Sequence, residues 1–430
     1  MRKTSAIRLA TVNGAAAPAR GESPRIALAL AGGGPLGAIY EIGALCALQE
    51  SLRGVDFTAL DHYVGVSAGG FIAAALANGM TPDELRQGFI DNSDESAEVF
   101  DPSWLTMPAW REFARRALRV PGLSATALWR GLVQRRSFIS ALERLGPALP
   151  TGVFANDEVD RRLAHLFSQP GRSNDFRQLA TRLTLVATDL DSGEAAPFGE
   201  PGWDDVPISR AVQASSALPG LFPPVEIGGK FYVDGALKKT LHATVALESG
   251  VDLLLCLNPL VPFDATAPAQ PEVMRRGLSA EHRHIPRIVE GGLPAVLSQT
   301  FRTMIHSRLE LGMKGYERAY PETDIVLFEP DHRDPEMYLA NTFSYAQRRH
   351  LAEHAYQQTR HLLRARRSHF AATFARHGIT LDMAALDDPH RRLVEPAPAP
   401  TRMGQAIARL QEVMDDLDHV LARAERRTAA

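Results

Sequence analysis

The chain has 430 residues, of which 45% are hydrophobic and 23% charged, as in ordinary globular proteins. Its net charge of −3 gives no reason to expect a nucleic-acid partner. No stretch approaches the roughly 18 apolar residues that a membrane-spanning helix needs. The two cysteines, Cys46 and Cys256, lie in apolar runs and are predicted to be buried thiols. We therefore expect a cytoplasmic protein, and peripheral contact with a membrane surface stays open.

The first 24 residues differ in composition from the rest of the chain. They begin with the basic Arg2 and Lys3, but Arg8 and Asn13 interrupt the apolar core of about 7 residues or more that a signal peptide requires. This pattern predicts a disordered leader over residues 1–24. Whether the leader directs export is left open.

Apolar runs alternate with helical patterns from residue 25 onward, which is typical of an α/β fold. Helices are predicted from Pro35 to about Leu52 and from Gly69 to Asn78. Strands are predicted at Arg25–Ala31, His62–Val66, Leu183–Thr188, Phe231–Val233, Val251–Leu257 and Asp324–Phe328. Helical crossovers between strands indicate a doubly wound, mainly parallel sheet flanked by helices, with a core over residues 25–260.

An insertion of distinct composition is predicted at about residues 82–150. Its first part, 82–101, is acidic, whereas 103–149 holds eight arginines against two glutamates and three of the four tryptophans. Arg and Trp on amphipathic helices favour a lipid headgroup interface. A helical cap whose tryptophans pack inward explains the same composition, and one cap over a site could do both.

The C-terminal third carries less chemistry. Residues 261–392 are expected to complete the core and to add a helical extension, because Arg and His recur at helical spacing over 345–378. A Pro/Ala linker is predicted at 393–400 and an amphipathic helix at 401–430. That helix has an apolar seam shorter than three heptads, so we expect it to dock on its own chain, with self-association as the alternative.

Three short motifs point to chemistry. Gly32-Gly33-Gly34-Pro35-Leu36-Gly37 follows the first strand, and its backbone N–H groups can face an oxyanion. Gly65-Val66-Ser67-Ala68-Gly69 ends the second strand and precedes a helix, the context of a nucleophile elbow. Asp234-Gly235-Ala236 supplies a carboxylate that can act as a base. Together the motifs predict a serine acyl-hydrolase.

Two other interpretations compete for these motifs. Gly32-x-Gly34-x-x-Gly37 also fits a dinucleotide-binding loop, which would make the chain a non-catalytic nucleotide- or lipid-binding module. That interpretation requires an acidic residue at the carboxyl end of the second strand, where this chain has Ser67. Asp61 lies at the opposite end, before the strand begins. No Lys-Ser/Thr follows the glycines, which excludes a P-loop. Ser67 could also merely cap its helix.

The base for Ser67 has two candidates. A Ser-His-Asp esterase would need a histidine after Asp234, and His242 is the nearest. However, an α/β-hydrolase normally builds several strands before its elbow, and only one strand–helix unit precedes Ser67. His242 also falls in a segment predicted to be helical.

Residues 25–260 resemble the patatin-like phospholipase family. The resemblance rests on the three motifs and on Ala214-Ser215-Ser216-Ala217-Leu218-Pro219-Gly220-Leu221-Phe222-Pro223-Pro224, which is similar to the family segment before the catalytic aspartate. Asp189 lies in a segment that is similar to a strand end of the family, and we expect a structural role for it. Leu36 departs from the family, which often has a basic residue there.

The resemblance implies a Ser–Asp dyad. Ser67 would be the nucleophile, Asp234 the proton acceptor, and the oxyanion hole would come from Gly32, Gly33, Gly34 and Ala68. Gly37, Gly65, Gly69 and Gly235 would complete the motifs. The implied function is a lipid acyl-ester hydrolase of the phospholipase A or lysophospholipase type, acting on phospholipid or another fatty-acyl ester. No cofactor is expected, and no Cys/His or EF-hand spacing suggests a metal. Headgroup, acyl position and chain length are left open.

Overall fold

The computed structural model describes residues 23–91, 107–117, 149–265, 287–339 and 345–394. The predicted leader lies almost entirely outside these ranges, as do most of the insertion, most of the Pro/Ala linker and the whole 401–430 helix. Those predictions therefore stay predictions.

The described residues form an eight-stranded sheet with the order β6-β7-β4-β3-β1-β8-β9, and β5 pairs beside β4. Pairs along β4-β3-β1-β8-β9 are parallel, and β5, β6 and β7 add antiparallel pairs at one side. The predicted mainly parallel sheet is therefore confirmed. The strands are β1 (Ile26–Leu30), β3 (His62–Gly65), β4 (Arg182–Asp189), β5 (Ala195–Phe198), β6 (Val225–Ile227), β7 (Lys230–Asp234), β8 (Leu253–Leu257) and β9 (Asp324–Phe328), and β2 (Leu52–Arg53) pairs with β10 (Thr380–Leu381) apart from the sheet.

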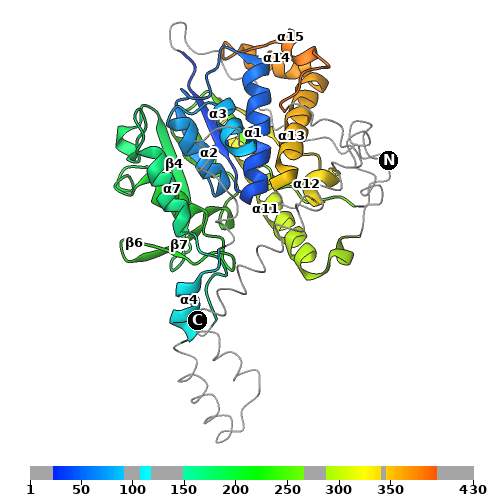
Figure 1. The fold of residues 1–430 in the computed structure, drawn as a ribbon. Coiled ribbons are helices and arrows are strands. Elements are labelled where there is room, and N and C mark those ends of the chain that lie inside the picture. Colours follow the sequence, from blue (N-terminus) through cyan, green and yellow to red (C-terminus); the bar gives the residue numbers. More distant parts are fainter. Residues whose placement is uncertain (1–22, 92–106, 118–148, 266–286, 340–344, 395–430) are drawn as a thin grey trace, which may run out of the picture. The chain divides into compact units, whose positions relative to one another are not determined.

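Helices surround the sheet, and α1 and α13 run side by side (Figure 1). The α-helices are α1 (Gly34–Ser51), α2 (Ala68–Ala77), α3 (Pro82–Arg86), α4 (Trp110–Ala117), α7 (Asp157–Phe167), α8 (Ile208–Ser215), α9 (Thr244–Glu248), α11 (Gly292–Ala319), α12 (Pro335–Leu339), α13 (Tyr345–Ala365), α14 (Arg367–Ala375) and α15 (Met383–Asp387). Single π or 3-10 turns are η1 (Gln87–Asp91), η5 (Phe176–Gln178), η6 (Gly235–Leu237) and η8 (Ile288–Gly291). A helical C-terminal region is thus present, as expected.

The order of the strands reverses beside β1. The chain moves from β1 to β3 and β4 in one direction, whereas β8 and β9 continue on the other side of β1. Crossover connections between parallel strands are right-handed. Helices of crossovers that run toward opposite edges of the sheet therefore cover opposite faces of the sheet. Accordingly, Ala27 and Ala29 of β1, and Ala31 directly after it, pack with α9 and α11 in one core. Such a reversal opens a crevice at the carboxyl ends of the strands, where α/β proteins bind ligands.

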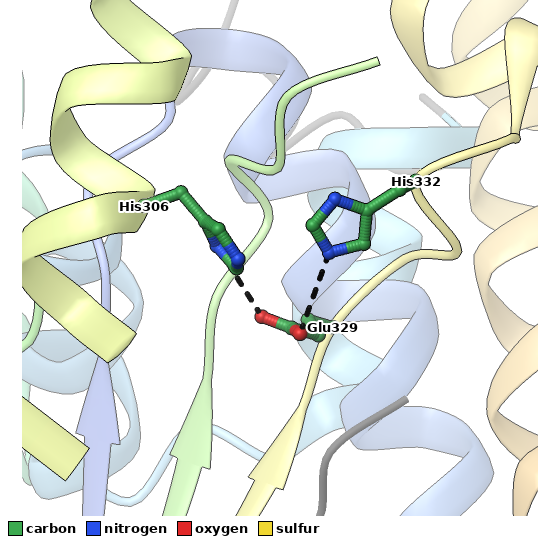
Figure 2. Close-up of side chains that lie close together, drawn as sticks. All are labelled: His306, Glu329 and His332. Atoms are coloured by element: carbon green, nitrogen blue, oxygen red, sulfur yellow. Dashed lines mark ion pairs between the residues drawn. The ribbon is translucent and has the colours of Figure 1, made fainter. Parts of the chain in front are cut away.

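Polar side chains gather at this carboxyl edge. β1 leads into the glycine loop, β3 leads into Ser67, and β8 leads into Asn258 and Pro259. Beyond β9, Glu329 and His332 face His306 of α11 (Figure 2). One edge of the sheet thus carries two groups of polar residues.

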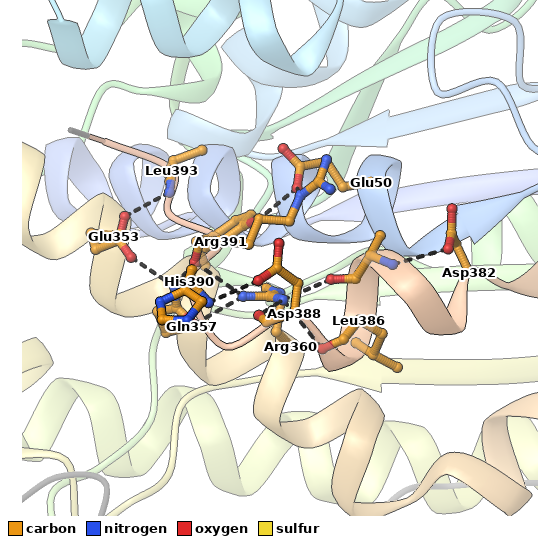
Figure 3. A network of polar contacts seen from close by, with 12 residues as sticks. Glu50, Glu353, Gln357, Arg360, Asp382, Leu386, Asp388, His390, Arg391 and Leu393 are labelled. Carbon is orange, nitrogen blue, oxygen red and sulfur yellow. Dashed lines mark hydrogen bonds and ion pairs between the residues drawn. The ribbon is translucent and has the colours of Figure 1, made fainter.

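A buried arginine of α13 binds the backbone of residues 385–391, near the end of the described chain (Figure 3). Arg360 of α13 is 1% exposed, and its guanidinium donates to the carbonyl oxygens of Ala385 (2.7 Å), Leu386 (3.2 Å), Asp388 (2.8 Å) and Arg391 (3.2 Å). Arg391 in turn pairs with Glu50 at the end of α1. These bonds satisfy the buried guanidinium, as a desolvated charge requires.

The structure also bears on the two cysteines and on membrane-spanning helices. Cys46 and Cys256 are buried and unpaired, as predicted, and burial raises the pKa of both thiols. Among the helices that the structure describes, none is both long and apolar enough to cross a membrane.

Candidate functional site

Ser67 lies on a tight turn between β3 and α2. Its backbone has φ 53° and ψ −123°, a strained conformation for a residue with a side chain. The turn needs glycine at position 69, because a Cβ there would lie 2.6 Å from the Ala31 carbonyl oxygen. Gly65 packs as closely on the start of α2, where its Cβ would lie 2.5 Å from the Gly70 Cα. The predicted elbow geometry is present.

The end of α8 braces the turn. The Ser67 N–H donates to the Ser215 hydroxyl oxygen at 2.8 Å, and that hydroxyl donates to the Val186 carbonyl of β4 at 2.7 Å. Two residues later, the Ala217 carbonyl accepts from the Asp234 N–H at 3.0 Å. One segment thus fixes the backbones of Ser67 and Asp234. Sequence reasoning missed this role of Ser215, whose only signal was a small polar residue at the end of an apolar helix.

Asp234 ends β7, and its side chain is held toward Ser67. One carboxylate oxygen accepts from the Ala236 N–H at 2.9 Å. Asp234 is 3% exposed, and burial raises the pKa of its carboxyl to about 6, although the Ala236 N–H and the nearby Ser67 side chain favour the ionised form. Gly235 lies against β4, where a Cβ would lie 2.1 Å from the Val186 carbonyl oxygen.

The glycine loop lies directly against Ser67. A Cβ at Gly32 would stand 3.0 Å from the Ser67 Cβ and 3.3 Å from the Ala236 Cβ. Among the described residues, none accepts a hydrogen bond from the N–H of Gly33 or Gly34. Ala68 is the first residue of α2, where N–H groups have no partner inside the helix. Backbone N–H groups at the starts of α1 and α2 therefore lie in the two segments next to Ser67.

Pro259 supports the loop from behind. The Gly33 carbonyl accepts from the Gly37 N–H at 3.0 Å and so opens α1. Positions 33 and 37 both pack on Pro259, whose Cγ would lie 2.7 Å from a Cβ at Gly33 and 3.1 Å from a Cβ at Gly37. Leu36, at the position that departs from the family, is buried. Sequence reasoning missed Pro259, because nothing in its local pattern links it to a loop more than 200 residues earlier.

His242 is placed differently from the prediction. It precedes α9 instead of lying in a helix, and its φ of 47° shows that the backbone turns there. Its Nε2 lies 3.1 Å from the Gly235 carbonyl oxygen, which can only accept, so Nε2 carries the proton. Burial lowers the pKa of His242 to about 4.

Asp189 is the last residue of β4, where a turn begins. Its carboxylate accepts from the N–H groups of Asp191 (3.0 Å) and Ser192 (3.2 Å), and these bonds lower its pKa. This arrangement fits the structural role expected for it.

The chain is similar to curated proteins over part of its length. The chain is 27% identical over 237 residues to uncharacterized NTE family proteins of Mycobacterium bovis and Mycobacterium tuberculosis, an alignment covering 55% of this chain and 49% of theirs. The chain therefore matches about half the length of these curated relatives.

Two solved structures also align. VipD from Legionella pneumophila is 16% identical with a TM-score of 0.33, and the alignment covers 78% of this chain and 67% of that one. The type III effector ExoU is 17% identical with a TM-score of 0.27, over 78% of this chain and 53% of that one. Scores this low support no conclusion about activity.

A family model covers the whole site. The model described as patatin-like phospholipase matches residues 28–247, about half of the chain, from β1 through the glycine loop, Ser67 and Asp234 to α9. The chain therefore belongs to the patatin-like phospholipase family.

Proposed function

We propose that this protein hydrolyses the acyl-ester bond of a lipid through a Ser–Asp dyad. The observation that carries the proposal is a buried carboxyl, Asp234, whose pKa burial raises to about 6 and which lies near enough to Ser67 for that side chain to favour its ionised form. A general base works best when its pKa lies near the working pH. Asp234 meets that condition and lies beside the residue whose proton it would accept.

The reaction then follows from the geometry. Asp234 takes the Ser67 proton as the serine oxygen attacks the ester carbonyl, and the carbonyl oxygen becomes an oxyanion. The tetrahedral intermediate collapses, the C–O bond to the alcohol breaks, and the protonated Asp234 returns the proton to the leaving oxygen. Water, deprotonated by Asp234, next attacks the acyl-serine and releases the fatty acid.

Backbone groups would stabilise the oxyanion. The N–H groups of Gly33 and Gly34 are not bonded to other described residues, and Ala68 begins a helix whose N-terminus favours negative charge. Gly32 brings the loop within van der Waals distance of Ser67. The Ser67 N–H is occupied by Ser215 and would not take part.

Exposed apolar side chains support a lipid substrate. Leu293, Leu297, Phe301 and Met304 recur along α11 at helical spacing and are 43–71% exposed. α11 follows β8 and leads into β9, so its first half starts from the carboxyl edge that carries Ser67. Such a stripe can contact acyl chains at an aggregate or membrane surface.

The Ser-His-Asp alternative is disfavoured by the placement of His242. The Nε2–H of His242 is committed to a backbone carbonyl, whereas Asp234 lies beside the serine itself. A triad needs the carboxylate on the histidine and the histidine on the serine.

Labelling with a serine-directed fluorophosphonate tests the proposal. The reagent should modify one residue of the full chain, and peptide mapping should place the adduct on Ser67. Ser67→Ala should stay unlabelled, whereas Ser215→Ala should still react if it remains folded. Absence of an adduct on the folded wild-type chain would contradict the hydrolase and favour a binding module.

The rate should depend on pH through Asp234. Because the base must be ionised and its pKa is about 6, kcat/KM for a soluble short-chain ester should fall about tenfold per pH unit below pH 6 and level off above it. A profile at constant ionic strength measures this. If activity persisted to about pH 4, the pKa of His242, the histidine would replace Asp234 as base.

A further inference from the structure

A second polar group lies at the carboxyl edge of the sheet, apart from Ser67 and Asp234. His306 comes from α11, and Glu329 and His332 follow β9 (Figure 2). One ligand atom from each of the three residues lies within 4.8 Å of the other two. Two imidazoles and one carboxylate thus converge from separate elements.

The distances within the group leave its members incompletely bonded. His306 Nδ1 lies 3.9 Å from the Glu329 carboxylate, and His332 Nε2 lies 3.8 Å from it. Both separations exceed a hydrogen bond. His306 is only 9% exposed, and its Nδ1 has no hydrogen-bond partner although it faces the carboxylate. A buried nitrogen in this condition costs free energy unless something binds it.

Surrounding contacts hold the Glu329 side chain and the loop that carries His332. The Asn258 side-chain amide donates to the Glu329 carboxylate at 3.3 Å. The His332 carbonyl accepts from the Asp264 N–H at 2.7 Å, which holds the loop after β9. Outer hydrogen bonds of this kind orient metal ligands and raise affinity.

The local charge also favours a cation. Glu310 lies one helical turn after His306, and the coulombic effect of its carboxylate reaches both His306 and His332.

We propose that His306, Glu329 and His332 bind a divalent transition-metal ion, with zinc as the best match. Zinc takes imidazole and carboxylate ligands at about 2.0–2.2 Å in tetrahedral geometry, which places neighbouring ligand atoms about 3.3 Å apart. The two His–Glu separations of 3.8 and 3.9 Å go to different oxygens of Glu329, and one ligand atom from each residue lies within 4.8 Å of the others, so the ligand atoms need to approach one another by up to about 1.5 Å. Calcium and magnesium prefer oxygen ligands and fit this donor set poorly. A two-histidine, one-carboxylate set leaves the fourth position open to water.

The position of the site gives the ion a mechanical effect. It would tie the loop after β9 to α11 and, through Asn258, to the end of β8. The next residue, Pro259, packs on Gly33 and Gly37. The ion would therefore stiffen the wall that supports the glycine loop.

Zinc titration of the full chain, without a histidine tag and after treatment with a chelator, tests the proposal. One Zn²⁺ should bind per chain, with Mg²⁺ binding at least 100-fold weaker. His306→Asn and His332→Asn should each weaken zinc binding at least 100-fold, since each removes a ligand. The control His165→Gln changes an exposed histidine of α7 and should bind like the wild type. Cobalt should give the intense visible bands of a four-coordinate ion in the wild type and in His165→Gln only.

Some results would overturn the site. If zinc failed to bind at micromolar concentration, or if His306→Asn and His332→Asn bound it as well as the control, the group would be an ordinary buried polar cluster. Circular dichroism of each metal-free variant checks its folding. The two variants change different elements, so either one that folds is sufficient for the comparison.

Discussion

Replacing Ser67 with alanine is expected to lower kcat for a soluble acyl ester by about 10⁴-fold or more, because the nucleophile is lost. Asp234→Asn should cause a loss of similar size. The asparagine keeps the shape of the side chain, its Oδ1 can still accept from the Ala236 N–H, and its Nδ2 can donate to the Ser67 oxygen. What it cannot do is accept the serine proton. Single-turnover and steady-state rates of both variants measure the effect.

The double variant is the sharper measurement. Residues that act as one catalytic unit give non-additive losses, so Ser67→Ala with Asp234→Asn should be scarcely slower than either single change. His242→Asn is the matched control, since asparagine tolerates the positive φ at that position. It should keep kcat within a few-fold of the wild type. If it were folded and as inactive as Ser67→Ala, a triad would replace the dyad.

Stability separates loss of chemistry from loss of fold. Burial raises the pKa of Asp234 from 3.8 to about 6, so ionisation of this group opposes folding. Its contribution is therefore least unfavourable below pH 4 and is fully unfavourable above pH 6, where it costs on the order of 2–3 kcal/mol. A neutral asparagine avoids that cost. Asp234→Asn should thus unfold at a higher temperature than the wild type at pH 8, although it is inactive.

Gly34→Ala is expected to reduce kcat by about 10²–10³-fold, the typical cost of one oxyanion donor. Gly34 has φ +60°, and a Cβ there would meet nothing within 4 Å. The substitution therefore acts through the backbone, which an alanine pulls away from the left-handed region at a cost of about 1–2 kcal/mol. The turn shifts, and the N–H of the loop points away from the oxyanion. KM should change much less than kcat, since the ground-state ester makes little use of this donor.

Gly79→Ala provides a matched comparison for this variant. Gly79 also has positive φ (81°) and nothing within 4 Å of its Cβ, but it follows the far end of α2. It should lose a similar amount of stability and keep its kcat. Equal kcat losses in the two variants would show that general destabilisation, and not the oxyanion hole, explains the effect. Saturable binding of a nicotinamide or flavin nucleotide that Gly34→Ala abolished would instead favour the dinucleotide interpretation.

Much of the core could be predicted because its signals are local. The apolar runs of β1 and β8 and the Ile325–Phe328 run of β9 are buried on both faces, and the limits of the three strands agree with the predictions to within one or two residues. The Gly-x-Ser-x-Gly turn was recognisable because glycine is required where strand and helix nearly touch, as at Gly69. Pro35 marked the start of α1 for the same kind of local reason.

Other features depend on contacts between distant segments. β5 and β6 are short and contain no long apolar run, and the Gly228-Gly229 turn that joins β6 to β7 was the unused signal for a hairpin. The sequence suggested no metal site, because metal-binding motifs are recognised from ligands that lie close together in the chain. His306 and Glu329 come from a helix and the strand after it, so their convergence becomes visible only when the two elements pack.

The pairing of β1 with β8 also governs the order in which the molecule can assemble during synthesis. β1 is a central strand, yet one neighbour arrives late: the Arg25 N–H bonds to the Asp252 carboxylate 227 residues further along the chain. A ribosome adding about 5–20 residues per second leaves that edge of β1 unpaired for some 10–45 seconds. An apolar, unpaired edge invites association with other chains meanwhile. Because Pro259 follows β8 directly, the loop that faces Ser67 gains its support only then. The nascent chain therefore carries Ser67 long before the loop that faces it can be supported.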